Sequence, residues 1–264
     1  MAITPVDLQV TNITATSARL RWVNALQALI SSLFGAGEPG AIYIPIPVVL
    51  GAQSLFQDAA GTVPVTADGD PVGKMIDQSG NGNHALQDNS SKRFIYKAGD
   101  ALLQDQVDDS ITISGLSLNP TLGTKTWTLC VGYSDFGNEN VILLSQLGGT
   151  RPWIGIGQSG SNSENLQSPG VTQTSVWFDG VIEYPATRGD MWALMSVSGV
   201  IVIEFTFEVS SILSWDNPTI GRYANSSFYG PKTSEFYLLR EGALTESQRK
   251  ELEAYAAELA GVNL

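Results

Sequence analysis

The chain has 264 residues, of which 27 are glycine and only 15% are charged, and its net charge at pH 7 is −12. This acidic balance argues against binding to nucleic acid, which needs clustered Lys and Arg, and against an anionic membrane surface. Cys130 is the only cysteine, so an internal disulfide is excluded and stability must come from packing or assembly. Abundant glycine with little charge favours an all-β, turn-rich protein.

The N-terminal region has no basic segment followed by an apolar one, and no apolar run in the chain reaches about 18 residues. We therefore expect no signal peptide and no membrane insertion, and we expect synthesis in a cytoplasm.

Residues 1–23 alternate between apolar and polar side chains in two short runs. Leu8 and Val10 form the first run, and Ala18, Leu20 and Trp22 form the second. This period of two predicts an N-terminal β arm of two half-buried strands. Two strands alone are marginally stable in water. The arm is therefore expected to complete its core on the main domain, on a neighbouring subunit or on a larger assembly, with an ordinary hairpin on its own domain as the alternative.

Residues 24–50 read as a short helix followed by an extended apolar connector. Asn24 is a suitable N-cap, and the next apolar residues share one helix face up to residue 34. The run 41–50 contains two prolines, which argue against a central strand and favour an edge or a position between subunits. The residues predicted to serve assembly are Leu8, Val10, Leu20, Trp22, Leu26, Leu29, Ile30 and Leu33.

From Ile111 onward, strand patterns recur every 10 to 15 residues between Gly- and Ser-rich turns, and no low-complexity linker divides the region. Residues 51–264 are therefore predicted to form one β domain. In the run Val200–Val209, apolar and polar side chains alternate, which predicts one buried and one solvated face. The clearest predicted strands are Thr126–Tyr133, Asn140–Ser145, Trp153–Ile156, Ser175–Phe178, Met191–Ser198, Val200–Val209 and Ser234–Arg240.

The last residues predict a helix over 245–260. Thr245 and Gln248 have the spacing of a capping box, in which each side chain bonds the backbone N–H of the other residue. Leu252 and Tyr255 lie on its apolar face, and Gly261 supplies the left-handed stop.

This ending resembles the close of the laminin-G-like, concanavalin A-like jelly-roll family, which implies a β-sandwich. The matching residues are Ile220, Gly221, Glu235, Phe236, Leu239, Ala243, Leu244, Thr245 and Gln248. Residues 3–22 resemble the first two strands of a fibronectin type III domain, and that resemblance stops at Trp22.

Residues 54–87 resemble a segment of bacteriophage and prophage proteins that carry the same jelly roll; the match includes L-F-Q-D at 55–58 and D-Q-S-G-N-G-N-H-A at 77–85. The resemblance implies a virion structural protein, made in the bacterial host cytoplasm, that decorates the head or forms a short fibre or tail tip. It also implies a homo-oligomer, with a trimer favoured, other virion proteins as partners and a host-surface glycan as a further one. The alternative is a carbohydrate-binding receptor module without a structural role.

The segment Asp77–Asn83 has oxygen-bearing side chains at alternate positions and glycine at the sixth, as in a calcium loop. The candidate ligands are Asp77, Ser79, Asn81 and Asn83. A compact turn held by Asn and Asp side chains explains the same residues. We expect no cofactor.

An enzyme is not expected from the sequence. His84 is the only histidine, and no G-x-S-x-G motif accompanies it. Glu204 and Glu208 share a strand face but would lie about 13 Å apart, which is too far for the paired carboxylates of a glycosidase.

Aromatic residues in predicted loops are candidates for stacking on sugar rings, because exposed rings beside Asn, Ser and Asp suit glycans. The alternative for each is core or interface packing. The candidates are Trp153, Tyr223, Phe228 and Tyr229.

Overall fold

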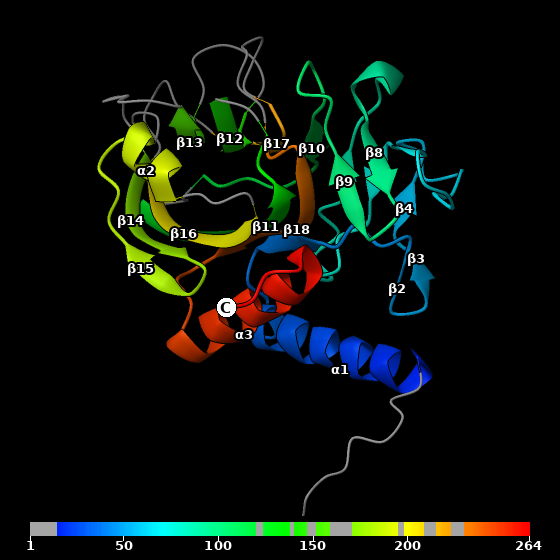
Figure 1. Cartoon of the computed structure of the whole chain (residues 1–264), viewed down its shortest axis with the longest axis horizontal. Helices are drawn as coiled ribbons and strands as arrows, with labels where there is room; N and C mark the ends of the chain where they lie inside the picture. Colours follow the sequence, from blue (N-terminus) through cyan, green and yellow to red (C-terminus); the bar gives the residue numbers. More distant parts are fainter. Residues whose placement is uncertain are drawn as a thin grey trace, which may run out of the picture.

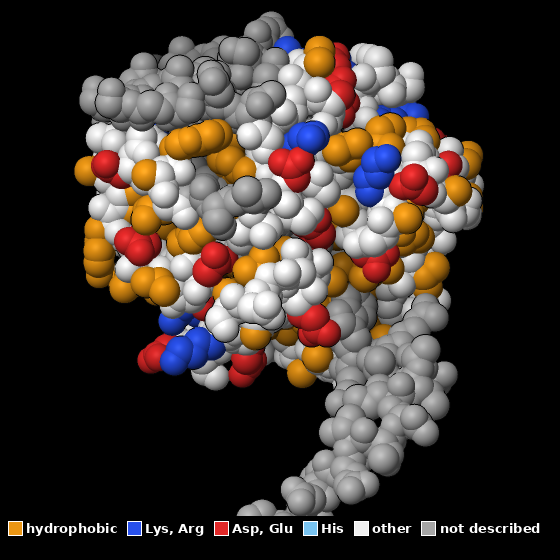
Figure 2. Space-filling view, in the orientation of Figure 1, with side chains coloured by type: hydrophobic (Ala, Val, Ile, Leu, Met, Phe, Trp, Pro, Cys, Tyr) orange, Lys and Arg blue, Asp and Glu red, His pale blue; other side chains and the backbone are white. Residues whose placement is uncertain are grey.

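The computed structural model is mostly β, with two antiparallel sheets that face each other and the helices α1 (Ala15–Phe34) and α3 (Glu246–Ala260) below them (Figure 1). None of the helices it describes is long and apolar enough to cross a membrane. Acidic side chains are scattered over the face seen in Figure 2 rather than gathered in one patch. The residues that the structure describes are 15–119, 124–137, 140–146, 152–158, 171–194, 198–208, 215–222 and 230–264.

The first sheet has nine strands, in the order β15-β14-β16-β11-β18-β9-β8-β5, with β1 also paired to β18. Its strands are β1 (Gly40–Tyr43), β5 (Pro71–Val72), β8 (Phe94–Lys97), β9 (Ala101–Leu103), β11 (Thr124–Asp135), β14 (Val171–Phe178), β15 (Val181–Glu183), β16 (Gly199–Glu208) and β18 (Thr233–Glu241).

The second sheet has seven strands, in the order β13-β12-β17-β10-β7-β6-β4, and β2 pairs with β3 in a separate hairpin. These strands are β2 (Val48–Val49), β3 (Ala52–Gln53), β4 (Leu55–Phe56), β6 (Lys74–Met75), β7 (Ala85–Leu86), β10 (Ile111–Ile113), β12 (Asn140–Ser145), β13 (Trp153–Gln158) and β17 (Thr219–Ile220). The helices are α1 (Ala15–Phe34), α2 (Arg188–Leu194), α3 (Glu246–Ala260) and a 3₁₀ turn η1 (Ser90–Lys92).

The main hydrophobic core lies between the two sheets. On β16, Ile201, Ile203 and Phe205 face this core, as their alternation predicts. Trp215 is fully buried among them and donates from its indole Nε1 to the Ser145 carbonyl at 3.1 Å. The two sheets therefore close over one another as a sandwich.

A second core lies on the outer face of the nine-stranded sheet, where α1 and α3 cover it (Figure 1). Val200 and Val202 of β16 and Leu238 of β18 are buried there. The prediction of a solvated second face for residues 200–209 is wrong at these positions, because two helices replace water. Glu204, on this face, is also buried and accepts from the Leu244 N–H at 2.9 Å.

The C-terminal helix is confirmed, together with both of its caps. Thr245 accepts from the Gln248 N–H while Gln248 bonds back to the Thr245 backbone, and Gly261 adopts φ +67°. Both signals are local, so the chain needs no distant contact to form them.

The short helix predicted over residues 24–34 is confirmed but is longer. It begins at Ala15, so the second strand predicted for the β arm is wrong. No glycine or proline interrupts residues 15–34, and a helix held at one end extends cooperatively through such a run. Leu20 and Trp22 therefore lie on a helix, whereas Leu8 and Val10 lie outside the described residues.

The strand predicted for Met191–Ser198 is also wrong, since residues 188–194 form α2. The Asp190 carboxylate accepts from the N–H groups of Ala186 and Thr187, and the Thr187 hydroxyl accepts from the Asp190 N–H. This is a reciprocal cap like that of α3, and it starts a helix where β propensity alone favours a strand.

The connector contributes a strand before its two prolines. β1 pairs antiparallel with β18, with Gly40 opposite Arg240 and Tyr43 opposite Tyr237. All four residues of β1 are buried. The division of the chain at residue 50 stays a prediction; the structure shows residues 26–49 contributing to the second core and to the nine-stranded sheet.

Candidate functional site

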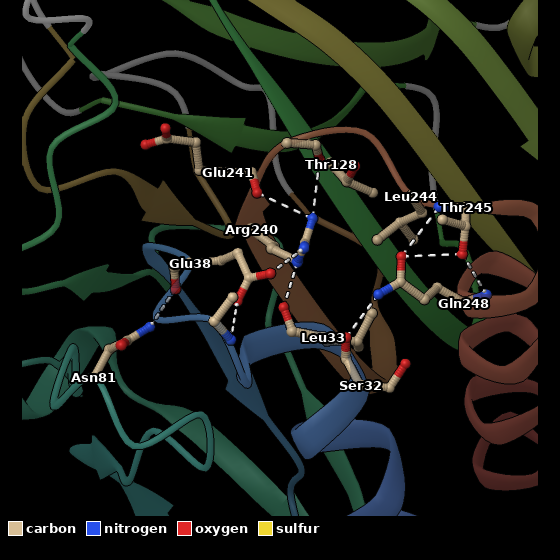
Figure 3. A network of polar contacts seen from close by, with 12 residues as sticks. Ser32, Leu33, Glu38, Asn81, Thr128, Arg240, Glu241, Leu244, Thr245 and Gln248 are labelled. Carbon is tan, nitrogen blue, oxygen red and sulfur yellow. Dashed lines mark hydrogen bonds and ion pairs between the residues drawn. The ribbon is translucent and has the colours of Figure 1, made fainter.

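The C-terminal end of α1 is fastened to the sandwich by side chains from two distant elements (Figure 3). The last carbonyl groups of a helix have no partner within the helix. Arg240 of β18 donates from Nε to the Leu33 carbonyl, and Gln248 of α3 donates from Nε2 to the Ser32 carbonyl at 2.6 Å. We call Arg240, Gln248 and Glu38 the α1 clamp.

Arg240 is the centre of the α1 clamp. Its Nη2 contacts Glu38 Oε1 at 2.9 Å, and its Nη1 donates to the Glu241 carbonyl at 3.0 Å. Only 5% of Arg240 is exposed. A positive charge at a helix C-terminus also opposes the negative end of the helix dipole. The sequence showed Arg240 only as the last residue of an apolar strand run.

The segment predicted as a calcium loop forms a hydrogen-bonded clasp on the free side of β1. Asp77 Oδ1 accepts from the N–H groups of Ile42 and Ser79, at 3.1 and 2.9 Å. Its Oδ2 accepts from the Ser79 hydroxyl at 2.8 Å and from the Asn83 N–H at 3.1 Å. His84 joins the clasp by accepting the Asp77 N–H at Nδ1.

The asparagines of this segment point their amide nitrogens at the backbone. Nδ2 of Asn81 donates to the Glu38 and Gly40 carbonyls, and Nδ2 of Asn83 donates to the Gly40 carbonyl at 2.8 Å. Because the Asp77 carboxylate is already fully engaged by donors, the geometry is that of a structural turn. The calcium site stays a prediction without support from this arrangement.

Replacing Asp77 by Ala should destabilise the fold by about 2–4 kcal/mol, because four donors lose their acceptor at a buried position. Urea unfolding of the variant measures this loss. The parent protein should show the same urea midpoint in EDTA and in millimolar calcium. A calcium-dependent rise in the midpoint that Asp77→Ala removes would contradict the structural interpretation.

The predicted sugar-stacking residues do not form one described platform. Trp153 lies on β13, half-buried, and the Arg188 guanidinium carbon sits 4.4 Å from its ring centroid. One face of this ring is thus covered by α2. Tyr223, Phe228 and Tyr229 lie outside the described residues.

The free edge of the nine-stranded sheet is apolar, which sequence analysis missed. Val181 is 59% exposed, Ile182 43% and Tyr184 77%. They lie on or just after β15, which is the edge strand at one end of the sheet order. Hydrophobic side chains gather at this left-hand border of the molecule in Figure 2. The sequence run V-I-E-Y-P at 181–185 is the signal from which this apolar edge could have been predicted.

Three carboxylates gather in the loop after β9, where the sequence reads D-Q-V-D-D. Oxygens of Asp105, Asp108 and Asp109 lie within 4.8 Å of one another. Burial raises the pKa of Asp109 to about 7, and the charges of Asp105 and Asp108 add to this. Burial likewise raises the pKa of Glu235 to about 7, although the Ser134 hydroxyl donates to it.

These raised pKa values predict that the protein loses stability as pH rises. Unfolded Asp and Glu ionise near pH 4, whereas Asp109 and Glu235 keep their protons in the fold until about pH 7. The free energy of unfolding should therefore fall between about pH 4 and pH 7, by roughly 3–4 kcal/mol for each of the two groups, and then level off. Urea midpoints at pH 5, 6, 7 and 8 measure this fall.

The variants Asp109→Asn and Glu235→Gln should each flatten this pH profile, because a neutral amide replaces the buried acid. Asp88→Asn, at an exposed position, is the matched control and should leave the slope unchanged. A midpoint that rises from pH 5 to pH 8 in the parent protein would contradict the prediction.

Comparison with known proteins gives no match: no family model, curated sequence or solved structure is similar to the chain at a significant level.

Proposed function

We propose that the chain is a structural protein of a bacteriophage particle, non-enzymatic and homo-oligomeric, that presents its sandwich on the particle surface. In finer detail we propose that the sandwich is a concanavalin A-like jelly roll and that the N-terminal region joins it to other copies or other virion proteins. The resemblance of residues 54–87 to phage proteins supports a place in a bacteriophage particle. The way α1 is held supports a role in assembly.

The observation that carries the proposal is the way α1 is held. Its C-terminal half is buried through Leu26, Leu29, Ile30 and Leu33, and the α1 clamp fixes its last turn. Of the predicted assembly residues, these four therefore pack within their own chain. At the other end, α1 begins at Ala15, and residues 1–14 precede it in the sequence. A helix that is fixed at one end, and that is preceded by a segment of alternating apolar and polar residues, is suited to joining one subunit to another.

The mass of the purified protein in solution, measured by light scattering, tests this proposal. The full chain should be an oligomer, and the chain lacking residues 1–14 should be a folded monomer. A full chain that remains monomeric at all concentrations would overturn the assembly role. An oligomer that survives the truncation would overturn the role of the N-terminal segment.

A further inference from the structure

Among the described residues, none bonds the backbone groups on the outer side of β15, at the sheet edge. β14 and β15 are joined by the two-residue turn Asp179-Gly180, with φ values of +46° and +81°. The residues that flank such a turn, Phe178 and Val181, form the hydrogen-bonded pair that closes it. By alternation, the N–H and C=O of Ile182 point away from β14, toward the open side.

Two of the three side chains of this edge strand are apolar, and Glu183 is its only charged residue. Natural edge strands are usually blocked by lysine, proline, a bulge or a covering segment. The other end of the same sheet is β5, which begins with Pro71. At β15 the proline comes two residues after the strand, and Val181 and Ile182 are both exposed. An apolar edge with free backbone groups is a template for an added strand.

The N-terminal segment of this chain has the pattern that such an edge accepts. Within residues 6–10, Val6, Leu8 and Val10 alternate with Asp7 and Gln9. A strand of this kind has one apolar face, which would continue the sandwich core beyond Phe178, and one polar face. Residues 1–14 precede α1 and are long enough to supply a strand that spans the three residues of β15, together with a linker.

The length of the chain excludes this pairing within one molecule. The end of α1 at Ala15 is the end further from β15 (Figure 1), so a returning segment must retrace the helix. A helix of 20 residues is about 30 Å long. The five residue steps from Val10 to Ala15 span at most about 18 Å when fully extended. The segment can therefore reach β15 only on another copy.

We propose that β15 binds residues 6–10 of a second copy of this chain as an added strand. This deepens the proposed function and rests on its homo-oligomer. Each copy gives a strand at one end and receives one at the other, so the contact is head-to-tail. Such a contact closes into a ring, such as a trimer, or propagates as a filament.

Cross-linking between two differently tagged full-length chains tests the contact directly. One chain carries Leu8→Cys and the other carries Glu183→Cys, and both retain Cys130, which is buried and shielded from reagent. A short bismaleimide should join the two tags. Leu8→Cys mixed with Asp88→Cys is the matched control and should give no product. A link formed inside one chain of a Leu8→Cys/Glu183→Cys double variant, or no link between tags, would overturn the proposal.

A second test blocks the edge while leaving the β14 pairing intact. Ile182→Pro removes the outward N–H, and Ile182→Lys adds a charge that natural edges use. Both should give folded monomers by circular dichroism and light scattering, whereas Ile182→Val should keep the oligomer. If the chain lacking residues 1–14 is monomeric but a folded Ile182→Lys variant remains an oligomer, residues 1–14 do join the subunits and β15 is not the strand that receives them.

Discussion

Removal of residues 1–34 is expected to abolish folding. Five apolar side chains of α1 are buried in the second core: Leu26, Leu29, Ile30, Leu33 and Phe34. Burial of each contributes about 1.5–3 kcal/mol, so together they contribute about 7–15 kcal/mol, which is comparable to the whole stability of a typical domain. Their loss also uncovers Leu238 and Leu252. The truncated chain should be insoluble or lack a cooperative urea transition.

The matched control is the chain that lacks only residues 1–14. It keeps α1 from Ala15 onward and should be soluble and unfold cooperatively in urea. A cooperative, soluble fold for the chain that lacks residues 1–34 would show that α1 is dispensable, contrary to its burial.

Replacement of Arg240 by Ala should cost about 3–5 kcal/mol, the usual range for breaking a buried ion pair from one side. The Leu33 carbonyl would lose its side-chain donor and Glu38 its ion-pair partner, which leaves Gln248 alone to hold the end of α1. The free energy of unfolding from urea titration measures the cost.

Lys250→Ala provides the control for charge removal. Lys250 contacts Glu246 at 2.6 Å on the exposed surface of α3, where such pairs contribute less than about 1 kcal/mol. Equal effects of the two substitutions would mean that the α1 clamp contributes no more than a surface pair. Arg240→Lys should recover only part of the loss, because an ammonium group cannot match the planar fork of donors.

The elements that the sequence predicted well are those whose signals are local. The caps of α3 lie within 17 residues of one another, and the strand 140–145 is bounded as predicted. The apolar side of β16 also follows from alternation alone, because Ile201, Ile203 and Phe205 enter the core between the sheets.

What the sequence could not show depends on distant partners. Arg240 bonds Leu33 across 207 residues, and Gln248 bonds Ser32 across 216, so no window of sequence contains either pair. The same holds for Val200 and Val202, which are buried because α1 and α3 cover their face of the sheet. Asp77 illustrates a different difficulty, since the residue types that bind calcium also build turns. The direction of the surrounding backbone N–H groups, which donate to the Asp77 carboxylate here, decides between the two.

The pairing of β1 with β18 constrains the order of folding during synthesis. A strand at residues 40–43 must wait for residues 237–240 before it can pair, and α1 must wait longer for Gln248. Contacts of this sequence separation slow folding, and until the last segment leaves the ribosome the apolar faces of the early elements have no native cover. A chain that stalls before α3 is therefore prone to aggregate, and only a chain synthesised through α3 can fold to a soluble native state.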